Sequence, residues 1–205
     1  MAQPARPSDR GFTWEDYQQW PDDQRWEIID GEAYDMSPPP TPRHQDIVGN
    51  LFHELKNHFR DKPCKPYVSP IGMKLSDLDI VQPDLLIVCK PEQVKRTHIE
   101  GTPTLVIEIL SPHSTAHDRL RKTRLYERFG VAEYWIVTPW PSLVEVFVLD
   151  GKSYRLHGVF GKEDTLSSPT FPDLKLALDG IFDFPLEPDE LPPAVREPPA
   201  AAYRS

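Results

Sequence analysis

Two nearly continuous apolar segments constrain the fold of this 205-residue chain more than any other feature. Residues 80–88 (IVQPDLLIV) and 104–110 (TLVIEIL) carry apolar side chains on both of the faces that alternate along a strand. Strands of this kind lie at the centre of sheets that helices cover on both sides. The two segments therefore predict an α/β fold in which helices flank a central mixed sheet.

Two helices are expected to provide that cover. Thr41 followed by Pro42 is typical of a helix start. From there to Phe59, apolar residues recur at helical spacing, which gives the helix one apolar face. The second helix is expected over residues 117–129, with Gly130 as its C-terminal cap.

Turn signals and short apolar runs predict the remaining strands. Asp30-Gly31 indicates an N-terminal β-hairpin, and Asp150-Gly151 indicates a further hairpin. Other strands are expected over residues 67–75, 133–139 and 144–149. An edge strand near 144–157 could pair with a second copy of the chain, so a homodimer is a possible assembly.

The chain is long enough for one well-packed domain. We expect residues 12–183 to form this domain, after a flexible N-terminal arm of residues 1–11. Residues 184–205 contain six prolines and predict a Pro-rich disordered tail. No apolar run is long enough for a membrane-spanning helix, so no membrane partner is expected.

The location expected from the sequence is cytoplasmic. The N-terminus lacks the apolar stretch of a secretion signal. Only two cysteines are present, Cys64 and Cys89, and they lie in unrelated sequence contexts. We expect two unpaired thiols in a reducing compartment rather than a disulfide.

The net charge of −9 limits the surface that could bind nucleic acid, because phosphates are neutralised by lysine and arginine. A local basic patch is compatible with this charge, since residues 113–130 contain five Lys and Arg against two Asp and Glu. Residues 90–98 add further basic groups. Arg121, Arg124 and Arg128 are expected on the outer face of the second helix, where arginines are commonly just solvated. The patch permits phosphate contacts without being diagnostic of them.

Each central apolar segment contains one carboxylate, Asp84 in the first and Glu108 in the second. Burying an ionised carboxylate costs roughly several kcal/mol unless it is paired or bound to a cation. Either residue alone could end its strand at a solvated rim and accept hydrogen bonds from a loop. The two together favour a shared cation.

Lys122 is the third candidate for this site. At helical spacing it shares a stripe with Leu125, Tyr126 and Phe129, so it should face the core. An inward-pointing ammonium needs a partner, and the two carboxylates on the sheet would supply one. Alternatively, the side chain could extend to solvent, or Asp118 could neutralise it.

Two further side chains are weaker candidates. His44 begins the inward face of the first helix, where it could contact a phosphate, transfer a proton, or serve as a hydrogen-bonded structural residue. Glu27, in the N-terminal hairpin, could add a third acidic group to a metal site, although an exposed hairpin residue is the more common arrangement. The two cysteines show no C-x-x-C spacing, so a structural zinc is not expected, and the phosphate-binding glycine loops and the serine-hydrolase elbow are missing from the sequence.

The spacing of the acidic residues resembles the signature of PD-(D/E)XK nucleases. Pro83-Asp84 is followed 24 residues later by Glu108 in an apolar strand. In that superfamily the two acidic residues hold Mg²⁺ or Mn²⁺, and a lysine orients or activates the attacking water. Leu110 replaces the lysine expected two residues after Glu108. Some branches carry this lysine on the following helix, which is where Lys122 is expected.

Four segments resemble the Uma-two family of restriction-endonuclease-like proteins, namely residues 26–51, 81–88, 106–137 and 144–147. The likeness extends from about Trp14 to Phe182 and implies a restriction-endonuclease-like fold. It also implies a nuclease site. Our leading hypothesis is a Mg²⁺-dependent endonuclease, with nucleic acid, expected to be DNA, as its partner. Mg²⁺ takes oxygen ligands, so the backbone carbonyl of Ile109 is a candidate ligand beside the two carboxylates. Two alternatives stay open: an inactive nucleic-acid or protein binding module on the same fold, and a metal-dependent hydrolase of another phosphoester.

Overall fold

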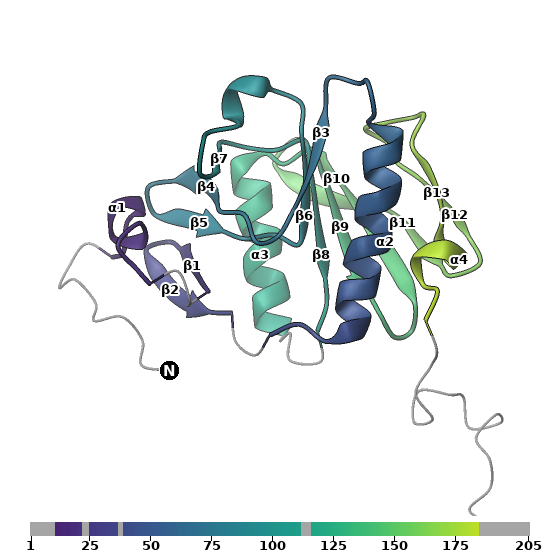
Figure 1. Cartoon of the computed structure of the whole chain (residues 1–205), viewed down its shortest axis with the longest axis horizontal. Coiled ribbons are helices and arrows are strands. Elements are labelled where there is room, and N and C mark those ends of the chain that lie inside the picture. The colour runs from purple at the N-terminus through teal and green to yellow at the C-terminus, as the bar shows by residue number, and fades with distance from the viewer. Residues whose placement is uncertain (1–10, 22–24, 37–38, 112–115, 185–205) are drawn as a thin grey trace, which may run out of the picture.

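The computed structural model describes residues 11–21, 25–36, 39–111 and 116–184. Almost all of the predicted N-terminal arm and Pro-rich tail lies outside these residues, so both remain predictions. The described part is the expected α/β arrangement of mixed sheets flanked by helices (Figure 1).

The larger sheet has six strands in the order β11-β10-β9-β8-β6-β3. The strands β8 and β9 run parallel, and the other neighbours are antiparallel. The bounds of these strands are β3 (Lys65–Val68), β6 (Leu85–Val88), β8 (Leu105–Ile109), β9 (Glu133–Thr138), β10 (Leu143–Asp150) and β11 (Ser153–Gly161).

Helices α2 (Pro42–His58) and α3 (Ala116–Phe129) cover opposite faces of this sheet (Figure 1). The alternation of side chains along β6 and β8 explains why both strands are apolar on each face. Leu85, Ile87 and Ile107 belong to the core cluster that contains the apolar face of α2. Leu86 and Val106 belong to the cluster that contains α3. The predicted doubly covered central strands are confirmed.

Both helices begin or end at the predicted signals. The side chain of Thr41 accepts a hydrogen bond from the backbone N–H of His44, and Pro42 occupies the first turn of α2. Gly130 follows α3 with a φ of +74°, a left-handed conformation that glycine adopts without steric cost. Local capping chemistry was therefore sufficient to place these helix ends.

The smaller sheet has five strands in the order β2-β1-β5-β4-β7. It contains the predicted N-terminal hairpin, whose turn residues Asp30 and Gly31 both have positive φ. A short helix, α1 (Trp14–Tyr17), lies beside it (Figure 1). The bounds are β1 (Trp26–Ile29), β2 (Glu32–Asp35), β4 (Met73–Ser76), β5 (Asp79–Val81) and β7 (Ile99–Glu100). The remaining elements are a 3-10 turn, η1 (Pro91–Gln93), and the C-terminal β12 (Thr165–Ser167), β13 (Lys175–Ala177) and α4 (Leu178–Ile181).

The prediction of a single strand over residues 80–88 is wrong in one respect. This segment is divided into β5, in the smaller sheet, and β6, in the larger sheet. The break falls at Gln82-Pro83-Asp84, because proline has no N–H to continue a ladder of hydrogen bonds. The strand expected over residues 67–75 is divided in the same way, between β3 and β4, around Pro70. Asp84 therefore lies at the crossing between two sheets, not within a strand face.

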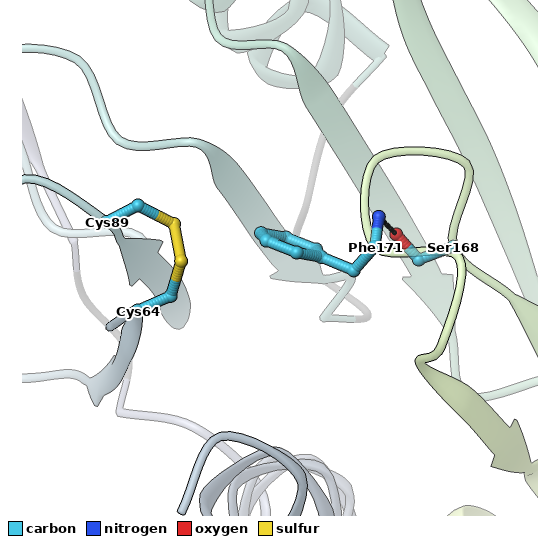
Figure 2. The surroundings of a disulfide bond; sticks show 4 residues. All are labelled: Cys64, Cys89, Ser168 and Phe171. Atoms are coloured by element: carbon cyan, nitrogen blue, oxygen red, sulfur yellow. Dashed lines mark hydrogen bonds between the residues drawn. A yellow bond between two sulfur atoms is a disulfide. The ribbon is translucent and has the colours of Figure 1, made fainter. Parts of the chain in front are cut away.

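The prediction of two unpaired thiols is also wrong. Cys64 and Cys89 form a disulfide with an S–S distance of 2.03 Å (Figure 2). They flank the antiparallel strands β3 and β6, whose register pairs Lys65 with Val88. Cys64 precedes Lys65 and Cys89 follows Val88, so the same register places the two cysteines opposite each other. Phe171 lies close to this disulfide in Figure 2, and its backbone N–H donates to the hydroxyl of Ser168 at 3.0 Å. The disulfide removes the argument from free thiols for a cytoplasmic location.

Two features bear on partners. Among the described residues, no helix is both long and apolar enough to span a bilayer. The strand β11 is an outer strand of the larger sheet, and Leu156 and Val159 on it are 47% and 53% exposed. The predicted homodimer through this region stays a prediction.

Candidate active site

A pocket of about 490 Å³ opens where the two sheets approach α2 and α3. Its walls include every side chain that the sequence nominated, together with Ile109. The nominated side chains are Glu27 on β1, His44 on α2, Asp84 at the crossing between sheets, Glu108 on β8 and Lys122 on α3. The fold therefore brings together residues from five different segments of the chain.

Lys122 lies between two glutamates. Its Nζ is 2.9 Å from Glu108 Oε1 and 3.0 Å from Glu27 Oε1. The predicted inward stripe of α3 is present, since Leu125 and Tyr126 on it are buried. The hydroxyl of Tyr126 donates to the same Glu108 oxygen at 2.6 Å. The helix thus directs both an ammonium and a phenol at one carboxylate.

The expectation that Glu27 would be exposed is wrong. Glu27 is only 5% exposed, because β1 lies between β2 and β5 and all four residues of β1 are buried. The backbone N–H of Gln82 donates to Glu27 Oε1 at 2.9 Å. This hydrogen bond and the ion pair with Lys122 satisfy the buried carboxylate, so Glu27 belongs to the pocket.

Asp84 is fixed from two sides. Its Oδ2 accepts a hydrogen bond from the backbone N–H of Ile109 at 2.8 Å. Because Ile109 follows Glu108 in the chain, this bond holds the Asp84 carboxylate near Glu108. His44 Nε2 lies 3.2 Å from the same oxygen. The other ring nitrogen of His44, Nδ1, is buried and has no hydrogen-bond partner among the described residues.

The ionisation of Glu108 is strongly perturbed. Burial raises its pKa, and the neighbouring charges of Asp84 and Glu27 add to this effect, whereas Lys122 and Tyr126 oppose it. The result is a pKa of about 7, against an ordinary value of 4.5. Burial lowers the pKa of Lys122, but the surrounding carboxylates, Glu108 first, outweigh burial and raise it. Lys122 is therefore protonated at neutral pH.

His44 responds to the same carboxylates. Burial would lower its pKa, but the hydrogen bond and charge of Asp84, with a contribution from Glu108, raise it above the ordinary value of 6.5. The backbone of Ile109 acts in the same direction. The nearby carboxylates therefore favour the protonated imidazole more than water does.

The pocket has the donor set and charge for a divalent cation. Three carboxylates surround one ammonium, so the cluster carries surplus negative charge when His44 is neutral. The contacts above use one oxygen of each carboxylate, namely Glu27 Oε1, Asp84 Oδ2 and Glu108 Oε1. Among the described residues, no three His, Cys, Asp or Glu side chains already form a metal-binding group. Mg²⁺ commonly uses only one or two carboxylates and keeps several waters, so this donor set fits it.

The arginines of α3 differ from expectation. Arg119 and Arg121 line the pocket, where Arg119 pairs with Glu145 at 2.6 Å and Arg121 pairs with Asp118 at 2.9 Å. Arg128 pairs with two aspartates of the smaller sheet, at positions 30 and 79, and is not just solvated. Only Arg124 of the three arginines expected on the outer face is simply exposed. This helix therefore connects the two sheets through its charged side chains.

Several residues of the pocket were not identified from the sequence, nor was Tyr126, which contacts Glu108 without lining the pocket. Arg25 and Gln82 line it, and neither stands out in any motif. Tyr126 was placed on the inward stripe only as an apolar residue, although its spacing of four from Lys122 signals a shared target. Glu133, a second buried glutamate in the sheet, was also missed; it accepts hydrogen bonds from Trp135, Ser168 and Thr170 and lies outside the pocket.

The comparisons with known proteins agree with this fold. Residues 14–179 match the model of the Uma2 family, which is described as "Putative restriction endonuclease". Over 115 residues the chain is 33% identical to an uncharacterized protein of Synechocystis sp., a match that covers 55% of this chain and 60% of that protein. A crystal structure from Anabaena variabilis, described as "a putative nuclease belonging to DUF820", has a TM-score of 0.69 at 18% identity. It covers 83% of this chain and 97% of that chain, and at this identity it shows the fold alone. Since the family model matches well over half of the sequence, the chain belongs to the Uma2 family.

Proposed function

We propose that this protein is a divalent-cation-dependent nuclease that hydrolyses phosphodiester bonds, with DNA as its substrate. The observation that carries the proposal is the cluster of Glu27, Asp84 and Glu108 around the ammonium of Lys122 in an open pocket. The descriptions of the Uma2 family and of the Anabaena variabilis structure support a nuclease.

Asp84 and Glu108 are the residues that would hold Mg²⁺ or Mn²⁺, with the backbone carbonyl of Ile109 as an additional ligand. A divalent cation held there would acidify a bound water and neutralise negative charge on the phosphoryl group. Glu108 must be ionised to act as a ligand, and its pKa is about 7. Cation affinity should therefore rise from pH 6 to pH 8.

Lys122 acts as a fixed positive charge and hydrogen-bond donor. Its raised pKa keeps the ammonium protonated, so it does not serve as the general base. The ammonium instead orients the attacking water or a phosphate oxygen and stabilises charge that develops in the transition state. Glu27 holds Lys122 in position through the 3.0 Å ion pair.

His44 is a positioning residue in this proposal. Through Nε2 it holds Asp84 Oδ2, and the N–H of Ile109 holds the same oxygen. Arg119 and Arg121 at the pocket wall would contact neighbouring phosphates by exchanging their present partners, Glu145 and Asp118.

The metal is tested by calorimetric titration of Mg²⁺ and Mn²⁺ into the full chain. Wild type should bind, Glu108→Gln should not, and Glu133→Gln should bind like wild type because Glu133 lies outside the pocket. Identical binding by wild type and Glu108→Gln would refute the proposed ligand.

The reaction is tested with plasmid, linear and single-stranded DNA in the presence of either metal. Lys122→Met should retain metal binding and lose cleavage, because it removes the ammonium and leaves the carboxylates. Arg124→Met, on the exposed face of the same helix, is the matched control and should cleave normally. DNA binding without cleavage in any metal would favour the inactive binding module. Cleavage of only small phosphoesters would favour a metal-dependent hydrolase of another phosphoester.

A further inference from the structure

A second pocket, of about 230 Å³, adjoins the first on the side of the smaller sheet. The two pockets share three lining residues, Arg25, Pro70 and Gln82. We infer that this second pocket binds one unpaired nucleobase of a single DNA strand, next to a phosphate that enters the first pocket. The inference rests on the proposed nuclease function and specifies its substrate as single-stranded or locally unpaired.

Aromatic rings form much of the wall of this pocket. Trp14, Tyr17, Trp20 and His98 are among its lining residues. Trp14 and Tyr17 stack with an interplanar angle of 18° and a centroid distance of 5.6 Å, and the ring of His98 lies 4.4 Å from that of Trp14. The side chains of Trp14, Tyr17 and Trp20 are only partly buried, and they pack against a buried cluster that includes Trp26. Their rings are thus supported from beneath while part of their surface faces the pocket.

The polar groups of the pocket suit the edge of a base and an adjoining phosphate. The side-chain amide of Gln82 donates to the hydroxyl of Tyr17 at 2.9 Å, and its carbonyl is an acceptor. Arg25 stands at the junction of the two pockets, where its terminal nitrogen donates to Ser69 at 2.9 Å. The Nε of Arg25 is buried without a hydrogen-bond partner in the part of the chain that the structure describes. Arg25 lines both pockets, so it is the cationic side chain that a phosphate at this junction would meet.

The backbone connects this pocket directly to the carboxylates. Gln82 contributes its side chain to the aromatic pocket and its N–H to Glu27, and Asp84 follows two residues later. A base held among these aromatic side chains would therefore lie beside Gln82, in the segment that carries the proposed metal ligand. The register of the strand relative to the scissile phosphate would be set by stacking.

The net charge of the chain favours an unpaired strand over a duplex. Binding of duplex DNA draws most of its affinity from phosphate neutralisation, for which a chain of charge −9 is poorly suited. Stacking of bases on aromatic side chains requires no such charge and is available only when a base is unpaired. A paired base presents its edges in the grooves and keeps its faces covered.

The inference is tested by fluorescence anisotropy in EDTA, with a labelled single strand, its duplex and an abasic strand of the same length. Wild type should prefer the intact single strand. Trp14→Ala should weaken that binding roughly 5- to 100-fold, the range expected for loss of one stacked base, and should leave the abasic strand unaffected. Trp14→Phe should retain most of the affinity, and Trp140→Ala, at an exposed tryptophan in the β9–β10 turn, should bind like wild type.

Several results would overturn the inference. These are equal affinity of wild type for intact and abasic strands, preference for the duplex, absence of binding to any strand, or equal effects of Trp14→Ala and Trp140→Ala. The comparison of intact and abasic strands on wild type needs no variant, so a misfolded Trp14→Ala protein would not prevent the decision. Failure of the nuclease proposal has a different signature: no strand is cleaved in Mg²⁺ or Mn²⁺, whatever the binding preference.

Discussion

Glu108→Gln should stabilise the fold at alkaline pH while it removes the proposed metal ligand. In the folded chain the pKa of Glu108 is about 7, against an ordinary value of 4.5, which is taken for the unfolded chain. A raised pKa contributes stability that is complete below pH 4.5 and is lost as pH rises through 7. The difference between the two pKa values corresponds to about 3 kcal/mol at pH 8.

Glutamine suits this experiment because it is neutral at every pH and nearly isosteric. Its amide oxygen can still accept hydrogen bonds from Tyr126 and Lys122, which both reach Glu108 Oε1 in the wild type. The difference in unfolding free energy between Glu108→Gln and wild type should therefore be near zero at pH 4.5. It should grow to about 3 kcal/mol in favour of the variant at pH 8.

The measurement is urea unfolding at several pH values in EDTA, so that no bound cation stabilises the wild type. The matched control is Glu133→Gln, because Glu133 is fully buried and accepts hydrogen bonds from Trp135, Ser168 and Thr170. An amide cannot accept all three as a carboxylate does, so this variant should lose about 1–3 kcal/mol. The reasoning is refuted if Glu108→Gln is less stable than wild type at pH 8, or if the difference does not change with pH.

Four further outcomes are expected. Addition of Mg²⁺ should raise the melting temperature of wild type and not of Glu108→Gln, as thermal unfolding by circular dichroism would show; equal shifts would place the cation elsewhere. Replacement of both Cys64 and Cys89 by alanine should cost about 3 kcal/mol, because the crosslink joins positions 25 residues apart, and urea unfolding of the variant would measure it. Arg128→Met should lower the free energy of unfolding by about 1–2 kcal/mol in the same assay, since it removes a partner of Asp79, whose side chain is 7% exposed. An unchanged free energy of unfolding would mean that this ion pair does not stabilise the fold. His44→Ala should weaken metal binding through Asp84 by about 10- to 100-fold in calorimetry, the usual effect of removing a residue that orients a ligand.

Much of the framework was predictable because the relevant signals are local. The two helices follow from capping residues and helical spacing, and the N-terminal hairpin follows from Asp30-Gly31. The meeting of Asp84, Glu108 and Lys122 was predictable as well. Polar groups on otherwise apolar faces must find one another or a cation, because isolation in the core is costly.

The wrong predictions share one physical origin. Each concerns a feature that is decided by which strands become neighbours in the sheets. The residues on either side of Pro83 entered different sheets, although their alternation suggested one strand. The burial of Glu27 follows from the position of β1 between β2 and β5. Hydrophobic patterns report how a segment is covered but not which segment covers it.

The sequence by itself determined the class of fold, the two covered central strands and the three charged residues that could not be buried alone. Only the tertiary structure decided that Glu27 and His44 join them, and that Cys64 meets Cys89 across β3 and β6. It also decided that an aromatic pocket shares a wall with the carboxylates. The physical reason is range: capping and periodicity act over a few residues, whereas strand order and register bring together groups dozens of residues apart.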